Sequence, residues 1–160
     1  METALELNSL SKSHNMAGWR MAMLATNSEF VQRILKVKSN VDSGMYRPMM
    51  VAATKALQNT KAWHDEMNAV YAKRRVLALQ IVETLNCSYD AKQVGMFIWA
   101  KIPDRYKDSG ELADEILYGK NVFITPGFIF GDKGKRYIRI SLCCPEEILS
   151  EALKRISIIN

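Results

Sequence analysis

One long helical pattern in the middle of the 160 residues constrains the fold of this chain more than any other feature. From about Ala62 to Leu85, apolar residues recur at helical spacing and form a single stripe. The members of the stripe are Trp63, Met67, Val70, Leu77, Ile81 and Leu85. A stripe of this kind is usually core packing, so we give it no catalytic role. The pattern separates residues 1–60 from residues 87–160, and each part must supply its own elements.

Charged residues on the long helix have a simple expected place. Lys73, Arg74 and Arg75 follow one another in the middle of the pattern. Such a run is usually the solvated side of a helix, and we expect that role here.

The first part reads as two strands followed by two helices. Strands are expected at 4–8 and 21–26, with a helix over 29–38 that Asn27 or Ser28 can cap. Pro48 fits the first turn of a second helix that runs to about Gln58.

The last part reads as three strands and two helices in β-α-β-β-α order. Strands are expected over 95–102, 122–125 and 136–142, and Pro126-Gly127 should stop the second of them. The sequence from Asp108 to Glu111 resembles a capping box for a helix to about Tyr118. Pro145 opens the last helix, whose expected buried face is Ile148, Leu149, Ala152, Leu153 and Ile156.

Composition limits the class of protein. Hydrophobic content is 48% and charged content 24%, as in ordinary globular domains, and no apolar run is long enough to cross a bilayer. The three cysteines, Cys87, Cys143 and Cys144, suit a reducing cytoplasm and burial as small apolar groups. The net charge of +5 comes from scattered basic residues, so we expect neither a nucleic-acid nor a membrane partner. The two histidines lack metal-ligand spacing, so no metal site is expected.

A cluster of chemistry-bearing residues lies near the start of the chain. Ser9-Leu10-Ser11-Lys12 is followed by Gly18-Trp19-Arg20, with the arginine eight positions after the lysine. A lysine amine can condense with an aldehyde, and its pKa falls readily in a buried or electropositive setting. The guanidinium of Arg20 suits phosphate oxygens, and the hydroxyls of Ser9 and Ser11 are further donors.

A second landmark lies downstream. Pro126-Gly127 and Phe130-Gly131 precede a strand that contains Arg139-Ile140-Ser141. A carboxylate in a partly dry cleft calls for a bidentate cation, and Arg139 is the candidate. Taken alone, Arg139 would more often be an ordinary strand arginine that faces water, and the lysine motif upstream is what favours the carboxylate role.

Together these residues resemble the class I/II aminotransferases, the fold type I enzymes that use pyridoxal 5′-phosphate (PLP). The lysine motif matches their Ser-x-Ser/Thr-Lys and Gly-x-Arg signature, and the downstream segment matches their P-G-x-x-F-G and R-I-S arrangement. The resemblance is best to the aspartate and aromatic aminotransferases. It implies an α/β fold and identifies the chain as a C-terminal portion of such an enzyme. Residues 1–60 would be the end of the large-domain sheet, 61–86 a linking helix, and 87–160 an α+β small domain.

The resemblance also implies roles for named residues. Lys12 would carry PLP and move the substrate proton, Ser9, Ser11 and Arg20 would bind its phosphate, and Arg139 would dock the substrate carboxylate. Substrates would be an amino acid and a 2-oxo acid, in a cytoplasmic homodimer when full length. The family is more than twice as long as this chain, so we expect these residues alone to be inactive.

Other readings stay open. The chain could be non-catalytic, either a remnant or a domain of a regulator that borrowed this fold. It could also serve another fold type I reaction, such as a β-lyase, a decarboxylase or a cyclopropane-carboxylate synthase, because the lysine signature is common to all of them.

Overall fold

The computed structural model describes residues 4–158 of the chain. The chain divides into two compact units, residues 1–64 and residues 65–160. Each unit has its own cluster of buried apolar residues, and these clusters share no member. No helix within the described range is long and apolar enough to cross a membrane.

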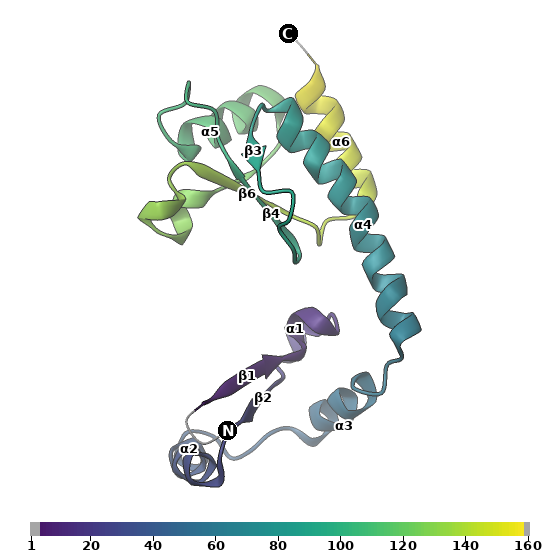
Figure 1. Cartoon of the computed structure of the whole chain (residues 1–160), viewed down its shortest axis with the longest axis vertical. Coiled ribbons are helices and arrows are strands. Elements are labelled where there is room, and N and C mark those ends of the chain that lie inside the picture. Colours follow the sequence, from purple (N-terminus) through teal and green to yellow (C-terminus); the bar gives the residue numbers. More distant parts are fainter. Residues whose placement is uncertain (1–3, 159–160) are drawn as a thin grey trace. The chain divides into compact units, whose positions relative to one another are not determined.

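The first unit is built on a two-stranded antiparallel hairpin (Figure 1). Strand β1 (Glu6–Ser9) pairs with β2 (Ala22–Ala25), with Ser9 opposite Ala22. The connection carries a single helical turn, α1 (Leu10–Ser13), and a 3-10 turn, η1 (Ala17–Trp19). Both expected strands are therefore confirmed, and they are neighbours in one sheet.

Two helices complete this unit. Helix α2 (Ser28–Val41) begins at Asn27, whose side chain accepts a hydrogen bond from the Phe30 amide at 2.9 Å. Helix α3 (Arg47–Ala56) carries Pro48 in its first turn, where a missing amide hydrogen costs nothing. The buried core is small and consists of Leu10, Met16, Met21 and Ala53.

The long helical pattern is confirmed as α4 (Lys61–Thr84). Its C-terminal half supplies the buried residues Ala78, Ile81 and Val82, and Leu85 follows directly. These pack in the core of the second unit against the sheet and the two remaining helices. The N-terminal members of the expected stripe, such as Met67 and Val70, are only half-buried.

The second unit holds a four-stranded antiparallel sheet in the order β3-β4-β6-β5. Its strands are β3 (Ser88–Tyr89), β4 (Phe97–Lys101), β5 (Thr125–Pro126) and β6 (Tyr137–Ser141). The expectation of three strands was wrong, because β3 is a two-residue edge strand that is too short to show alternation. The strand expected over 122–125 is also wrong in its bounds.

The shift of β5 has a physical reason. Helix α5 (Ser109–Lys120) ends at Asn121, whose φ of 53° turns the chain sharply, and the Val122 amide then donates to the Ile116 carbonyl. The chain reaches the sheet only at Thr125, which lies opposite Arg139, and Pro126 lies opposite Ile138. Pro126 is tolerated within β5 because this strand is at the edge of the sheet.

Helices α4, α5 and α6 (Glu146–Ser157) bury one face of the sheet. Leu149 and Ile156 of α6 are buried, and Ala152 and Leu153 pack partly against the core. Ile148, which was expected on the buried face of α6, is 57% exposed. The face of α6 that packs against the core is therefore narrower than the sequence pattern predicted. The expected cap of α5 is also modified: Asp108 accepts from Gly110 and Glu111, but Glu111 accepts from the Lys107 amide.

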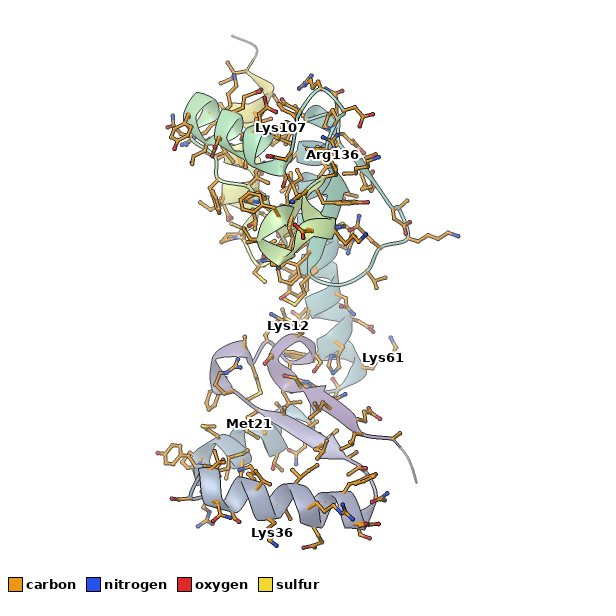
Figure 2. The ribbon with its side chains drawn as sticks, turned by 90° about the vertical axis from the view of Figure 1, so that its left-hand side faces the viewer. Lys12, Met21, Lys36, Lys61, Lys107 and Arg136 are labelled. Carbon is orange, nitrogen blue, oxygen red and sulfur yellow. The ribbon has the colours of Figure 1, made fainter. Side chains whose placement is uncertain are left out.

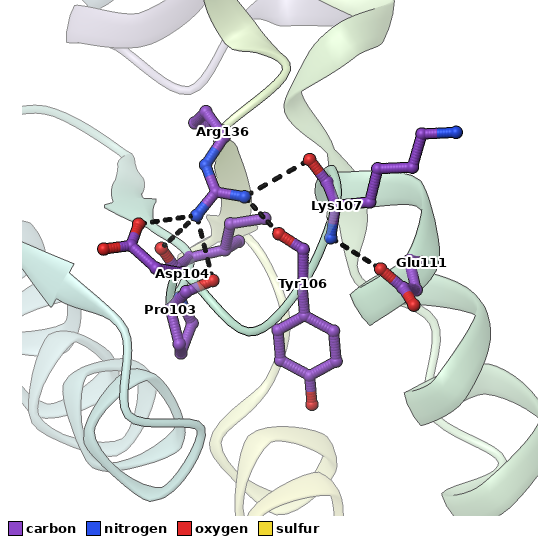
Figure 3. A network of polar contacts seen from close by, with 7 residues as sticks. Pro103, Asp104, Tyr106, Lys107, Glu111 and Arg136 are labelled. Carbon is purple, nitrogen blue, oxygen red and sulfur yellow. Dashed lines mark hydrogen bonds and ion pairs between the residues drawn. The ribbon is translucent and has the colours of Figure 1, made fainter.

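Arginines fasten the loops of this unit to its core. The Arg136 guanidinium donates to the carbonyls of Ile102, Pro103, Tyr106 and Lys107 and pairs with Asp104 at 3.0 Å (Figure 3). Arg74 donates to the Leu142 carbonyl, and Arg75 donates to those of Gln93 and Gly95. The expectation that Arg74 and Arg75 would face solvent was therefore wrong, and only Lys73 of that run is exposed.

Candidate functional site

The lysine motif occupies the connection between the two strands of the hairpin. Ser9 ends β1, Ser11 and Lys12 lie in α1, and Arg20 directly follows η1. The Leu10 amide donates to the Met21 carbonyl at 3.1 Å, which closes the base of this loop. The four residues that the family resemblance identified are thus brought to one end of the hairpin, and Figure 2 shows Lys12 there, away from Lys36 of α2.

Hydroxyl groups organise the turn that carries Lys12. Ser9 Oγ accepts a hydrogen bond from the Ser11 amide at 3.2 Å, and the two hydroxyl oxygens lie 2.9 Å apart. Ser13 donates to the Ser9 carbonyl at 3.3 Å, so the turn is bonded from both ends. Leu10 is buried beneath it, whereas Lys12 is exposed.

Arg20 adopts a left-handed backbone conformation, with φ 54° and ψ 42°. Few residues other than glycine, asparagine and aspartate take this conformation readily, so it marks a position set by its surroundings. Nη1 of Arg20 donates to the Ala17 carbonyl at 3.1 Å, and the side chain is exposed. The guanidinium is therefore held on the same loop as the two serines and the lysine.

An aromatic group beside this loop was missed by the sequence reasoning. The His14 ring stacks on Trp63 with centroids 6.1 Å apart and meets His64 edge-on at 5.2 Å. His14 Nδ1 also lies 2.8 Å from Ser13 Oγ. The sequence analysis placed Trp63 in the apolar stripe of the long helix and considered the two histidines only as metal ligands. Helical spacing within α4 does not predict a contact with the lysine loop.

Arg139 belongs to the second unit, in the middle of β6. Its guanidinium carbon lies 4.3 Å from the centre of the Phe97 ring and 4.2 Å from the centre of the Phe130 ring. Within the described range, no carboxylate lies at ion-pair distance from the Arg139 guanidinium and no protein group accepts a hydrogen bond from that guanidinium. By contrast, the guanidinium groups of Arg136 and Arg75 in the same unit donate hydrogen bonds to backbone carbonyls.

Strand alternation explains how this arrangement forms. Ile98, Ala100, Ile138 and Ile140 are buried on the inner face, so Phe97, Trp99, Tyr137 and Arg139 share the outer face. Trp99 lies directly opposite Arg139 and stacks on Tyr137 at 5.3 Å. The alternation of Phe97-Ile98-Trp99-Ala100 was a usable signal for these aromatic neighbours, but it identifies no partner strand.

Phe130 comes from outside the sheet, on the 3-10 turn η2 (Gly127–Phe130). Two glycines fix this turn, because a Cβ at Gly127 would lie 2.5 Å from the carbonyl oxygens of Gly134 and Tyr137. A Cβ at Gly134, in η3 (Asp132–Gly134), would lie 2.0 Å from the Gly127 carbonyl oxygen. Only glycine at both positions lets the two segments cross this closely.

A groove of about 360 Å³ runs beside the same strand. It lies between residues 121–125, β6 and α6, with Ile124, Ile140 and Leu149 along its floor and Arg139 among its lining residues. Cys144 also lines it, whereas Cys143 is exposed and Cys87 is buried. The expected burial of the cysteines is therefore correct for Cys87 and wrong for Cys143.

The donor set of the lysine loop fits PLP. The loop presents an amine for the aldehyde carbon, and two hydroxyls and a guanidinium that suit a phosphate. The guanidinium and the amine both add positive charge, as an anionic cofactor requires.

Comparison with known proteins gives a consistent result. Residues 1–156 match the model of the family "Aminotransferase class I and II". The chain is 37% identical over 156 residues to LL-diaminopimelate aminotransferase of Maridesulfovibrio salexigens, covering 98% of this chain and 40% of that protein. The corresponding enzyme of Oleidesulfovibrio alaskensis is 37% identical over 157 residues, with the same shares covered.

Solved structures agree. The aromatic aminotransferase of Pyrococcus horikoshii matches with a TM-score of 0.87 and 28% identity, over 98% of this chain and 42% of that one. The chain thus spans about 40% of the length of the curated relatives it matches. Members of this family use PLP with amino-acid and 2-oxo-acid substrates and are commonly dimeric. By its sequence and its fold, this chain belongs to the class I and II aminotransferases, the fold type I PLP enzymes.

Proposed function

We propose that this chain supplies the cofactor-lysine and substrate-carboxylate parts of an enzyme that transfers an amino group between an amino acid and a 2-oxo acid. Residues 1–60 serve as part of the PLP-binding large domain, 61–86 as the linking helix, and 87–160 as the small domain. The observation that carries the proposal is the lysine loop, where Ser9, Ser11, Lys12 and Arg20 lie on one hairpin connection.

The lysine loop has two tasks in this proposal. Arg20, Ser9 and Ser11 bind the phosphate, and Lys12 binds the aldehyde carbon. PLP, when bound, supplies an electron sink for the bond broken at the substrate α-carbon. The Lys12 amine takes the α-proton and returns it as general base and acid, which requires an amine that is neutral when it acts.

Arg139 has the other task, which is to hold the substrate α-carboxylate. Its donors are not used by other described groups of the protein, as expected of a cation kept for a ligand. Fixing the carboxylate also fixes the direction of the α-carbon–hydrogen bond relative to the base. We propose a homodimer as the assembly. LL-diaminopimelate, named for the curated relatives, is the amino donor to try first.

An amino-transfer assay tests the proposal on a protein that spans the relatives' full length. A chimera provides one, with the preceding segment of the M. salexigens enzyme joined ahead of this chain. We expect PLP-dependent transfer to a 2-oxo acid. Arg139→Lys should lower kcat/KM by roughly 30- to 1000-fold, because losing a charged bidentate contact costs about 2–4 kcal/mol.

The matched control for that assay is Arg33→Lys on the exposed face of α2, which should leave kcat/KM unchanged. PLP absorbance should be the same in the parent chimera and in both variants. A folded, PLP-loaded Arg139→Lys chimera with the parent kcat/KM would refute the carboxylate role.

A further inference from the structure

The way Arg139 is held suggests a further role for its neighbours, and this inference rests on the proposed function of Arg139. Phe97 belongs to β4 and Phe130 to η2, so two separate segments place a ring over the same guanidinium carbon at 4.3 and 4.2 Å. A cation above an aromatic face is attracted by the ring, and this attraction uses none of the N–H donors.

This manner of fixing differs from that of Arg136 and Arg75 in the same unit. Arg136 and Arg75 are fastened by donating guanidinium N–H groups to backbone carbonyls, and those N–H groups are then occupied. The guanidinium of Arg139 instead lies over two aromatic rings, which accept no conventional hydrogen bond. A long side chain normally loses rotamer freedom when it binds a ligand, and a guanidinium that is already held loses less.

We propose that Phe130 and Phe97 are positioning residues that preorganise Arg139 for carboxylate binding. Of the two, Phe130 is the residue whose ring can be removed by substitution without disturbing the core. Phe97 is built into the central strand β4, beside the buried Ile98. Phe130 is 49% exposed, and its ring contacts Trp99, with centroids 5.9 Å apart, and the guanidinium of Arg139. Removing the Phe130 ring should therefore remove one of the two ring contacts of the guanidinium without opening the core.

The neighbouring residue Phe128 provides a matched control. It lies on the same turn and is similarly exposed, at 45%, but its ring lies against Gly110 at the start of α5. Phe128→Leu and Phe130→Leu remove the same atoms from the same turn. Only the second substitution removes a contact of Arg139.

The experiment measures the mobility of the Arg139 side chain by ¹⁵N relaxation of its Nε–Hε group, in the whole 160-residue chain. Exposed Arg33 is the internal reference. We expect Arg139 to be more rigid than Arg33 in the parent chain and in Phe128→Leu, and to approach Arg33 in Phe130→Leu. Phe130→Tyr should restore the rigidity because it restores the ring.

Carboxylate binding is measured in the same samples by titrating pyruvate and following the Arg139 Nε–Hε shift. Loss of one ring should weaken binding about two- to fivefold in Phe130→Leu, the effect of one cation–π contact at an exposed site. The inference is overturned if Arg139 is as mobile as Arg33 in the parent chain, or if Phe130→Leu changes neither mobility nor affinity. If pyruvate leaves the Arg139 signal of the parent chain unmoved, the carboxylate role itself fails and the positioning role falls with it.

Discussion

At the scale of single residues, the proposed chemistry depends on how the side chains of Lys12 and Arg139 are held. Lys12 lies on a turn whose hydroxyls are bonded to one another and to the backbone. The guanidinium of Arg139 lies over the rings of Phe97 and Phe130. Both residues were identified from the sequence, because their motifs fix residue types at short spacing. Phe97 was not, because its relation to Arg139 depends on the pairing of β4 with β6.

Cys87 shows how burial alone changes a group. The side chain is 7% exposed, and burial raises the pKa of its thiol to about 11. In the unfolded chain the thiol ionises near pH 8.5. Below pH 8.5 the thiol is neutral in both states, and its burial contributes fully to the free energy of unfolding. As the pH rises from 8.5 toward 11, the thiol ionises only in the unfolded chain. Ionisation stabilises the unfolded state, so the free energy of unfolding falls.

Alkaline unfolding with and without this thiol tests the point. We expect the free energy of unfolding of the parent chain to approach that of Cys87→Ala as the pH rises from 8 to 11. The difference should shrink by about 2–3 kcal/mol. Denaturant unfolding under reducing conditions measures it, and a difference that stays constant over this range would contradict the account.

At the scale of elements, the sequence predicted the long and periodic segments well. The hairpin strands, α2, α3, α4, α5 and α6 all lie close to their expected bounds. The errors lie where tertiary contacts decide. Pro126, read as a strand breaker, is itself part of β5, and Ile148 faces outward although its spacing suits the buried face.

The two close glycines give the sharpest prediction for an element. Gly127→Ala would place a carbon 2.5 Å from two backbone carbonyl oxygens, so η2 or its neighbour must move. We expect a loss of about 1–3 kcal/mol in the free energy of unfolding, as for other overpacked sites. The displaced turn also carries Phe130 away from Arg139.

Gly119→Ala is the control for that substitution. It lies inside α5, and its new Cβ would meet no atom within 4 Å. We expect it to stabilise the chain by roughly 0.5–1 kcal/mol, because alanine favours a helix over glycine. Denaturant unfolding measures both variants, and equal stability of the two would show that the crossing at Gly127 is not tight.

At the scale of the whole molecule, the two units differ in how much core they have. Among residues 4–158, the second unit buries a large apolar cluster between its sheet and three helices, whereas the buried cluster of the first unit has four members. The first unit leaves Ile34, Leu35, Val37 and Val41 of α2 exposed. The sequence predicted the strands and helices of this unit but not the exposure of these side chains. Apolar periodicity identifies the apolar face of a helix, but it does not identify the segment that packs against that face.

The central claim is that Lys12 is the lysine that holds PLP, and covalent trapping tests it most directly. The 160-residue chain is incubated with limiting PLP, reduced with borohydride, and examined by intact mass and peptide mapping. The parent chain and Lys36→Ala, which removes an exposed lysine of α2, should carry one reduced cofactor on the peptide containing Lys12. Lys12→Ala should lose that adduct. Equal labelling of Lys12→Ala, or labelling of the parent chain mainly at other lysines, would contradict the account.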